Sequence, residues 1–304
     1  MPVEAAALAG VAHLPGAAKP DPILVVDEMR KTFGGLVAVD VEHLEIQRGV
    51  ITALIGPNGA GKTTFFNLLT GFERPDSGRA TFDGRKLDRP SPHRLAKQGM
   101  VRTFQLTKSL TKLSVIDNMK LGAKQQTGER MMRSLIPPLW RAQEREIEAR
   151  ADALLERFKL AHMREEYAGT LSGGQRKLLE MARALMAEPS LICLDEPMAG
   201  VNPALTQSLL EHVKQLRQEG ISVVFVEHDM DVVRDISDWV VVMGEGQVIA
   251  EGTSESIGRN QAVIDAYLGT HHDAPLDIEE EQAMLAEDEA ILGGDVPAGF
   301  EEAP

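Results

Sequence analysis

The sequence predicts an α/β fold in which a parallel sheet carries an antiparallel β layer and a helical subdomain. Three observations support this fold class: strands and helices that alternate in the C-terminal half, β-forming residues near the N-terminus, and a helix-rich stretch between them. The alternation places strands at Leu191 to Leu194, Ser222 to Val226 and Trp239 to Met243, and helices at Pro203 to Glu219 and Met230 to Ile236. Because each helix joins one strand to the next, we expect the strands to run parallel.

The N-terminal part of the chain predicts the antiparallel layer. Residues 23–46 are rich in β-forming side chains and contain the turn Phe33-Gly34-Gly35, and a further strand is expected at Arg79 to Phe82. This layer flanks the short apolar strand Ile51 to Ile55. A helix is expected to begin near Gly61, with side chains facing a core at Phe65, Phe66, Leu68 and Leu69.

The middle of the chain predicts helices. From about Thr107 to Tyr167 the pattern is helical, notably at Arg141 to Leu160, with an interruption at Pro137-Pro138. We therefore expect a helical subdomain over about residues 107–188. No apolar run in the sequence approaches the roughly 20 residues that a membrane-spanning helix requires, so the chain is not expected to cross a membrane by itself.

The two ends of the chain differ in composition from the rest. Residues 1–20 are rich in Ala, and Glu4 stands where a signal peptide would carry basic residues, so we expect a flexible N-terminal extension and a cytoplasmic protein. Residues 271–304 contain 11 acidic residues and no Lys or Arg, so most of the net charge of −14 belongs to them. An acidic, disordered tail is expected there, with a short helix that docks on a partner as the alternative. The single cysteine, Cys193, lies in an apolar run and is expected to be a buried hydrophobic residue.

A glycine-rich segment after the first apolar strand has the spacing of a phosphate-binding loop. Its backbone N–H groups can converge on phosphate oxygens, because the segment follows a strand and opens a helix. Lys62 adds a positive charge, and Thr63 offers its hydroxyl to Mg²⁺. The expected residues of this nucleotide site are Gly56, Pro57, Asn58, Gly59, Ala60, Gly61, Lys62, Thr63 and Thr64.

Polar side chains are expected at the carboxyl ends of further strands, where ligands gather in parallel α/β sheets. Asp195 and Glu196 end the apolar run that begins at Leu191. We expect Asp195 to hold Mg²⁺ and Glu196 to polarise the attacking water as general base. His228 follows the next strand and is expected to contact a γ-phosphate and this water. Gln105 follows an apolar stretch, and its amide could reach Mg²⁺ or the water.

A second glycine-rich motif, Ser172-Gly173-Gly174-Gln175, opens another expected helix. Ser172 is a good N-cap residue, and the glycines leave backbone N–H groups and the helix dipole accessible to an anion. An ordinary helix cap is the alternative. Since one nucleotide is already bound by the first loop, a second phosphate cradle favours a nucleotide shared with another subunit.

The order and spacing of these motifs from about Ile23 to Leu268 resemble those of ATP-binding cassette ATPases. The resemblance implies a P-loop NTPase (RecA-like) core at residues 21–270 and ATP with Mg²⁺ as cofactors. It also implies a head-to-tail nucleotide sandwich, in which Ser172 and Gly174 face the γ-phosphate bound by the other subunit. By the same resemblance Phe33 stacks on adenine, although a core position is the alternative. The family often has Asp where this chain has Asn202, which leaves open any inter-subunit role that requires a carboxylate.

A narrower resemblance is to the ATPase subunits of bacterial branched-chain amino acid importers. It rests on four motifs: Phe33-Gly34-Gly35-Leu36, Val101-Arg102-Thr103-Phe104-Gln105, Glu227-His228-Asp229-Met230 and Ala266-Tyr267-Leu268-Gly269. It implies a peripheral subunit on the cytoplasmic face of the membrane, bound to integral-membrane permease subunits and to a distinct second ATPase, with a homodimer as the alternative. A substrate-binding protein would act indirectly.

Other functions share part of this pattern. Cassettes that move urea, short amides or lipopolysaccharide have similar motifs, so the cargo stays open at this point. A cassette ATPase that acts on DNA or the ribosome is the other alternative, since basic and aromatic residues mix at Arg130, Arg133, Trp140, Arg141 and Arg145. We interpret that mixture as a solvated helix face and expect no nucleic-acid partner.

Overall fold

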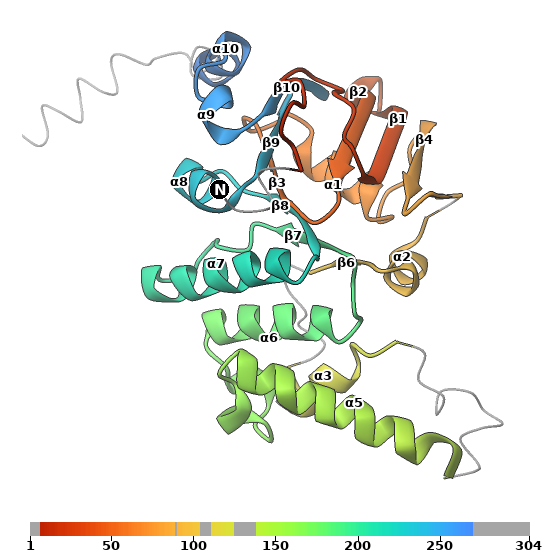
Figure 1. Cartoon of the computed structure of the whole chain (residues 1–304), viewed down its shortest axis with the longest axis vertical. Coiled ribbons are helices and arrows are strands. Elements are labelled where there is room, and N and C mark those ends of the chain that lie inside the picture. Colours follow the sequence, from red (N-terminus) through yellow and green to blue (C-terminus); the bar gives the residue numbers. More distant parts are fainter. Residues whose placement is uncertain (1–6, 89, 104–110, 125–137, 270–304) are drawn as a thin grey trace, which may run out of the picture. The chain divides into compact units, whose positions relative to one another are not determined.

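The computed structural model describes residues 7–88, 90–103, 111–124 and 138–269 (Figure 1). The elements discussed below belong to the compact unit Met1–Tyr267, except for the last two residues of the final helix. Two sheets organise this unit, one of four strands and one of six. None of its described helices is long and apolar enough to cross a membrane.

The four-stranded sheet is the antiparallel layer that the sequence predicts. Its strands are β1 (Pro22–Phe33), β2 (Leu36–Gln47), β4 (Ser77–Phe82) and β5 (Arg85–Lys86), in the order β2-β1-β4-β5. The β1–β2 hairpin turns at Gly34 and Gly35, whose φ angles of +54° and +92° are readily adopted by glycine. Phe33 pairs with Leu36 across this turn, so the aromatic ring lies at the end of the hairpin.

The six-stranded sheet has the order β10-β9-β3-β8-β7-β6. Its parallel strands are β3 (Ile51–Ile55), β6 (Met100–Arg102), β7 (Leu191–Asp195), β8 (Ser222–Val226) and β9 (Trp239–Gly244), and β10 (Gln247–Gly252) pairs with β9 in the antiparallel sense. All residues of β3 and β8 are buried, as expected for parallel strands that are covered on both faces. The expected α/β architecture is confirmed.

Different helices cover the two faces of this sheet. Helix α1 (Lys62–Leu69) contributes Phe65 and Phe66 to a core shared with the antiparallel layer and with alternate sheet residues such as Cys193. The opposite face of the sheet packs on the helices α6 (Gly173–Leu185), α7 (Pro203–Gln218), α8 (Met230–Ile236), α9 (Ser254–Ile257) and α10 (Gln261–Gly269). Helix α2 (Pro92–Gln98) lies between β5 and β6 in the chain. The sheet therefore separates α1 from α6.

The described part of the middle region is helical, as predicted. Figure 1 shows α3 (Val115–Lys120) and α5 (Pro138–Arg157) beyond α6, followed by the 3₁₀ turns Ala161–Met163 and Ala168–Thr170. One face of α5 enters the same core as α6, through Ile147, Ala151, Leu155 and Phe158. The boundaries 107–188 remain a prediction, because residues 104–110 and 125–137 lie outside the described residues.

The expectation of a flexible extension at residues 1–20 does not hold for residues 7–20. The side chains of Lys19 and Glu251 are fully buried, and Lys19 Nζ lies 2.7 Å from Glu251 Oε2. The same carboxylate accepts hydrogen bonds from the Gly16 N–H at 2.7 Å and from Trp239 Nε1 at 3.1 Å. Leu8 is also buried in the core under the antiparallel layer. The composition of residues 1–20 does not indicate this packing, because the partner Glu251 lies more than 200 residues further along the chain.

We expect the Lys19 and Glu251 pair to be required for stability. In Lys19→Met the Glu251 carboxylate stays buried without a counter-charge, so the free energy of unfolding should fall by about 3–5 kcal/mol. Urea denaturation of the full chain measures this loss. The double variant Lys19→Met/Glu251→Gln should recover part of the loss, since no charge is then buried alone.

A matched control for this prediction is Arg30→Met, which breaks the exposed ion pair with Asp40 at 2.9 Å. Exposed pairs contribute only about 0–1 kcal/mol, so this variant should unfold close to the wild type. Equal small losses in Lys19→Met and Arg30→Met would show that the buried pair does not anchor the segment.

Candidate functional site

The phosphate loop connects β3 to α1 and is packed too closely for any residue but glycine at two positions. Gly56 has φ +149° and Gly61 has φ +92°. A Cβ atom at Gly56 would lie 2.2 Å from the carbonyl oxygen of Met243, and one at Gly61 would lie 2.3 Å from that of Ala38. The loop backbone is thus held against β9 and β2, as a loop that binds phosphate through its N–H groups requires.

Lys62 closes over this loop. Its Nζ donates to the carbonyl oxygens of Gly56 at 2.6 Å and Pro57 at 2.8 Å. Burial lowers the pKa of Lys62, and the nearby charge of Glu196 opposes that shift. The first turn of α1 carries no acidic residue, so its N-terminus and Lys62 together favour an anion. The loop therefore fits a polyphosphate.

Asp195 and Glu196 lie at the carboxyl end of β7, as predicted. Asp195 pairs with Val226 of β8, and the Glu196 N–H donates to the Val226 carbonyl at 3.1 Å. Glu196 has a φ of +44°, a conformation that non-glycine residues seldom adopt. Since the charge of Glu196 acts on Lys62, the structure brings the expected general base to the phosphate loop.

Arg102 is a residue of this site to which the sequence assigns no role. Its Nη2 donates to Asp195 Oδ2 at 2.5 Å, and its Nη1 donates to Asn67 Oδ1 at 2.6 Å and Thr70 Oγ1 at 3.0 Å. The guanidinium also lies over the rings of Phe66 and Phe72. Arg102 therefore joins the expected metal ligand to the helix that follows the phosphate loop. In the sequence, Arg102 stands out only as a member of the motif Val101-Arg102-Thr103-Phe104-Gln105, which indicates no bond to Asp195.

His228 follows β8 at the same edge of the sheet. Its side chain is 71% exposed, and its Nδ1 lies 3.8 Å from Glu227 Oε2. Glu227 is buried, accepts the Met198 N–H at 3.0 Å, and has its pKa raised by burial. An exposed imidazole beside the strand that ends at Asp195 is accessible to a nucleotide and to water.

The motif Ser172 to Gln175 caps α6. The Gln175 N–H donates to Ser172 Oγ at 3.3 Å, and the Ser172 N–H donates to Gln175 Oε1 at 2.9 Å, which forms a capping box. A Cβ atom at Gly173 would meet nothing within 4 Å, whereas one at Gly174 would lie 1.6 Å from Leu205 Cδ2. Helices α6 and α1 pack on opposite faces of the sheet, so this motif and the phosphate loop precede helices on different sides of it.

The other expected positions have varied surroundings. Phe33 is 48% exposed with Lys31 Nζ over its ring, so it is not a core residue. Asn202 is the N-cap of α7, and its side chain accepts the Leu205 N–H at 3.0 Å. Cys193 is buried, which raises its pKa to about 12, as expected for an inert core thiol. Gln105 lies outside the described residues.

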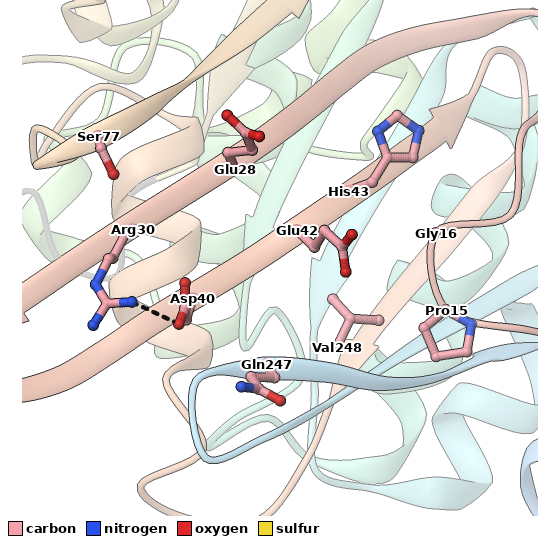
Figure 2. Close-up of a pocket in the computed structure, with 10 residues that line it drawn as sticks. All are labelled: Pro15, Gly16, Glu28, Arg30, Asp40, Glu42, His43, Ser77, Gln247 and Val248. Atoms are coloured by element: carbon pink, nitrogen blue, oxygen red, sulfur yellow. Dashed lines mark hydrogen bonds and ion pairs between the residues drawn. The ribbon is translucent and has the colours of Figure 1, made fainter.

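A large hollow lies away from the phosphate loop. It has a volume of about 670 Å³ and lies between β1, β2, the start of β10 and residues 15–16 (Figure 2). Glu28, Asp40 and Glu42 line it, and Arg30 is paired with Asp40. Because its three carboxylates outnumber its one arginine, this lining would repel a polyphosphate, and we assign no nucleotide to it.

Comparison with known families and proteins agrees with this geometry. The family model described as ABC transporter matches residues 39–199, a range that contains the phosphate loop, Ser172 to Gln175, Asp195 and Glu196. The chain belongs to the ATP-binding cassette family. A second model, described as branched-chain amino acid ATP-binding cassette transporter, matches residues 247–273. The chain is thus an ATPase of the ATP-binding cassette type, and its cofactor is a nucleotide.

The chain aligns with nearly the whole length of several named relatives. The chain is 43% identical to the probable branched-chain amino acid transport ATP-binding protein LivG of Archaeoglobus fulgidus, over 81% of this chain and 95% of the relative. It is 40% identical to the high-affinity branched-chain amino acid transport ATP-binding protein BraF of Pseudomonas aeruginosa, over 82% and 98%. A crystal structure of an ATP-binding cassette of an ABC transporter in its ADP conformation matches with a TM-score of 0.71 and 38% identity, over 82% of this chain and 99% of that chain.

The segment matched by the second cassette model also reaches the phosphate loop. Tyr267 on α10 packs against the core of the six-stranded sheet. Its half-burial raises the pKa of the phenol, and a backbone hydrogen bond with Gly56 lowers it. A bond that lowers the pKa is one in which the Gly56 N–H donates to the phenol oxygen. Tyr267 therefore supports the first residue of the loop, a contact that the sequence motif alone does not indicate.

We expect Arg102→Lys to destabilise the cassette although it keeps the charge. A single ammonium cannot replace a fork that binds Asp195, Asn67 and Thr70 in one plane, so the free energy of unfolding should fall by about 1–3 kcal/mol. Denaturation in urea measures this change. The control is Arg79→Lys, whose exposed pair with Asp27 is 3.1 Å long and should change stability by less than about 0.5 kcal/mol. Equal stability of the two variants would contradict the bridging role of Arg102.

Proposed function

We propose that this chain is the ATP-hydrolysing subunit of a bacterial importer for branched-chain amino acids. The observation that carries the proposal is the match of residues 247–273 to the branched-chain amino acid cassette model, together with relatives named for that transport. The geometry at β3, β7 and β8 supports the hydrolytic part. Cargo selection would belong to the permease and to a substrate-binding protein, so the cargo rests on these relatives.

In the proposed mechanism each polar residue at the sheet edge has one task. The loop Gly56 to Thr63 binds the phosphates through its N–H groups, with Thr64 following on α1, and Phe33 stacks on adenine. Glu196 accepts a proton from the attacking water, and Gln105 and His228 hold that water and the γ-phosphate. Lys62 neutralises phosphate charge in both the ground state and the transition state.

The residues present fit Mg²⁺. Among the described residues no group of three or more His, Cys, Asp or Glu side chains gathers as a metal cage. A nucleotide-bound Mg²⁺ needs only one or two protein oxygen ligands besides phosphates and water. Asp195 and the Thr63 hydroxyl would supply them, with Gln105 as a third ligand. The ion, when bound, would neutralise charge on the phosphate oxygens.

Hydrolysis is proposed to require a second ATPase subunit. Ser172 and Gly173 are exposed at the start of α6, which packs on the other face of the sheet from α1. In a head-to-tail dimer, the partner's motif that corresponds to Ser172 to Gln175 would face the γ-phosphate bound by Lys62. We propose a related but distinct partner, with a homodimer as the alternative.

A hollow surface beside β6 is suited to a permease. An apolar cavity of about 230 Å³ is lined by Phe72, Leu95 and Met100, and a second of about 340 Å³ is lined by Leu121, Gly122 and Arg183. Both cavities share Ala96, Val101 and Arg102, so they form one groove. Phe72 and Leu121 are 44% and 59% exposed at its walls. An exposed apolar groove of this kind indicates a protein partner. The proposed permease would hold the subunit at the cytoplasmic face of the membrane.

Two variants test the hydrolytic site. Lys62→Ala should abolish productive ATP binding, because the phosphate charge is no longer neutralised. Glu196→Gln should keep the affinity for ATP and lose about 10²–10⁴-fold of the hydrolysis rate, since it removes only the base. Nucleotide affinity and phosphate release are measured for both proteins. A wild-type rate in Glu196→Gln would reassign the base.

One groove variant tests docking and cargo together. Leu121→Glu places a charge in the groove and should prevent co-purification with the permease and uptake of labelled leucine in a deletion strain. The control is Leu14→Glu, an exposed apolar residue outside the groove, which should restore uptake as the wild type does. Permease binding by Leu121→Glu would refute the docking surface. Normal leucine, isoleucine and valine uptake in the deletion strain would refute the cargo alone.

A further inference from the structure

The loop that follows Glu196 is bound by a lysine from another element. Lys177 lies on α6, one helical turn after the capping box at Ser172. Its Nζ donates to three carbonyl oxygens, those of Glu196 at 3.1 Å, Pro197 at 2.9 Å and Ala199 at 2.6 Å. An ammonium group has three N–H donors, so all of them are used on this one loop.

The same loop is bound from its other side by a carboxylate. Glu227, at the end of β8, is buried and accepts the Met198 N–H at 3.0 Å. Its second oxygen accepts the His228 N–H at 3.3 Å. Within the loop, the Ala199 N–H donates to the Glu196 carbonyl at 3.2 Å, and the Val201 N–H donates to the Met198 carbonyl at 3.2 Å. The loop is therefore a compact turn with a cation on its carbonyls and an anion on one of its N–H groups.

We propose that Lys177 and Glu227 are positioning residues for ATP hydrolysis, which hold the backbone of Glu196 and couple it to α6. This inference rests on the proposed role of Glu196 as general base. Neither side chain needs to touch the nucleotide. Lys177 contacts the carbonyl of Glu196 itself, and Glu227 contacts the residue two positions later.

The unfavourable backbone conformation of Glu196 explains why the loop needs contacts from other elements. Glu196 has a positive φ, a conformation that costs of the order of 1–3 kcal/mol and persists only where surrounding contacts fix it. A misplacement of about 1 Å in a reacting group can cost about 10²-fold in rate, so small relaxation of this turn would matter.

The coupling to α6 follows from the burial of Lys177. Burial lowers the pKa of Lys177, while the charges of Glu227, Glu180 and Glu196 raise it. A half-buried ammonium that left its three carbonyls would lose bonds that few other groups could replace. Lys177 therefore moves with the loop, and a shift of Ser172 at the start of α6 shifts Glu196. A nucleotide of the partner subunit that binds at Ser172 to Gln175 would thereby change the position of the proposed base, Glu196.

The decisive experiment separates turnover from binding in the full chain. Lys177→Met should lower kcat for ATP hydrolysis at least about 10-fold, while the dissociation constant for ATP changes less than about 2-fold. Hydrogen exchange should become faster in the peptide that contains Met198 and stay unchanged in the phosphate loop. The control is Lys214→Met on α7, which removes an exposed ion pair with Asp235 and should alter neither quantity.

Variants of Glu227 give a second test, which remains informative if Lys177→Met folds poorly. Glu227→Gln keeps an acceptor for the Met198 N–H and should retain kcat within about 3-fold, whereas Glu227→Leu removes it and should lose at least about 10-fold. A wild-type kcat in Lys177→Met, or equal rates in the two Glu227 variants, would overturn the inference. Parallel losses of ATP affinity and kcat would also overturn it, by showing a general structural role. A wild-type chain that binds ATP without hydrolysing it, alone and with its partner subunits, would instead refute the proposed function.

Discussion

The parallel pairing of β3, β8 and β7 is the constraint on which the rest of the site depends. Parallel strands end at the same edge, and here the register aligns Leu54 of β3 with Val226 of β8, and Val226 with Asp195 of β7. The phosphate loop, the pair Asp195 and Glu196, and His228 follow these three ends. The register of these strands thus brings three separate stretches of sequence to one edge of the sheet.

The same sheet also separates functions. Alternate residues of each strand point to opposite faces, so one face builds the core with α1 and the antiparallel layer, and the other builds the core with α6 and α7. The phosphate loop and the motif Ser172 to Gln175 therefore precede helices on different sides of the sheet. The proposed site, which uses both motifs, would therefore need two chains. The positive φ at Glu196 lies in the turn that Lys177 connects to α6.

Features carried by local sequence could be predicted, and features that depend on distant partners could not. The strands, the phosphate loop and the cap at Ser172 follow from periodicity and short motifs, and the expected strand at residues 191–194 differs from β7 by only one residue. The anchoring of Lys19 by Glu251 and the bridge from Arg102 to Asp195 join residues 232 and 93 positions apart. No pattern of neighbouring residues indicates such pairs. The amide of Gln105 remains a sequence-based expectation.

Two half-buried lysines show how one kind of contact can serve two purposes. Both Lys62 and Lys177 donate to loop carbonyls, and burial lowers the pKa of each. Lys62 uses two of its three donors on Gly56 and Pro57, and these carbonyls belong to the loop that binds phosphate. A phosphate offers a charged acceptor in their place, so Lys62 can exchange partners at little cost. Lys177 instead donates to three neutral carbonyl oxygens of one turn, those of Glu196, Pro197 and Ala199. With three bonds to one turn, Lys177 has the contacts that a positioning residue needs, whereas Lys62 makes two bonds within the loop that follows β3.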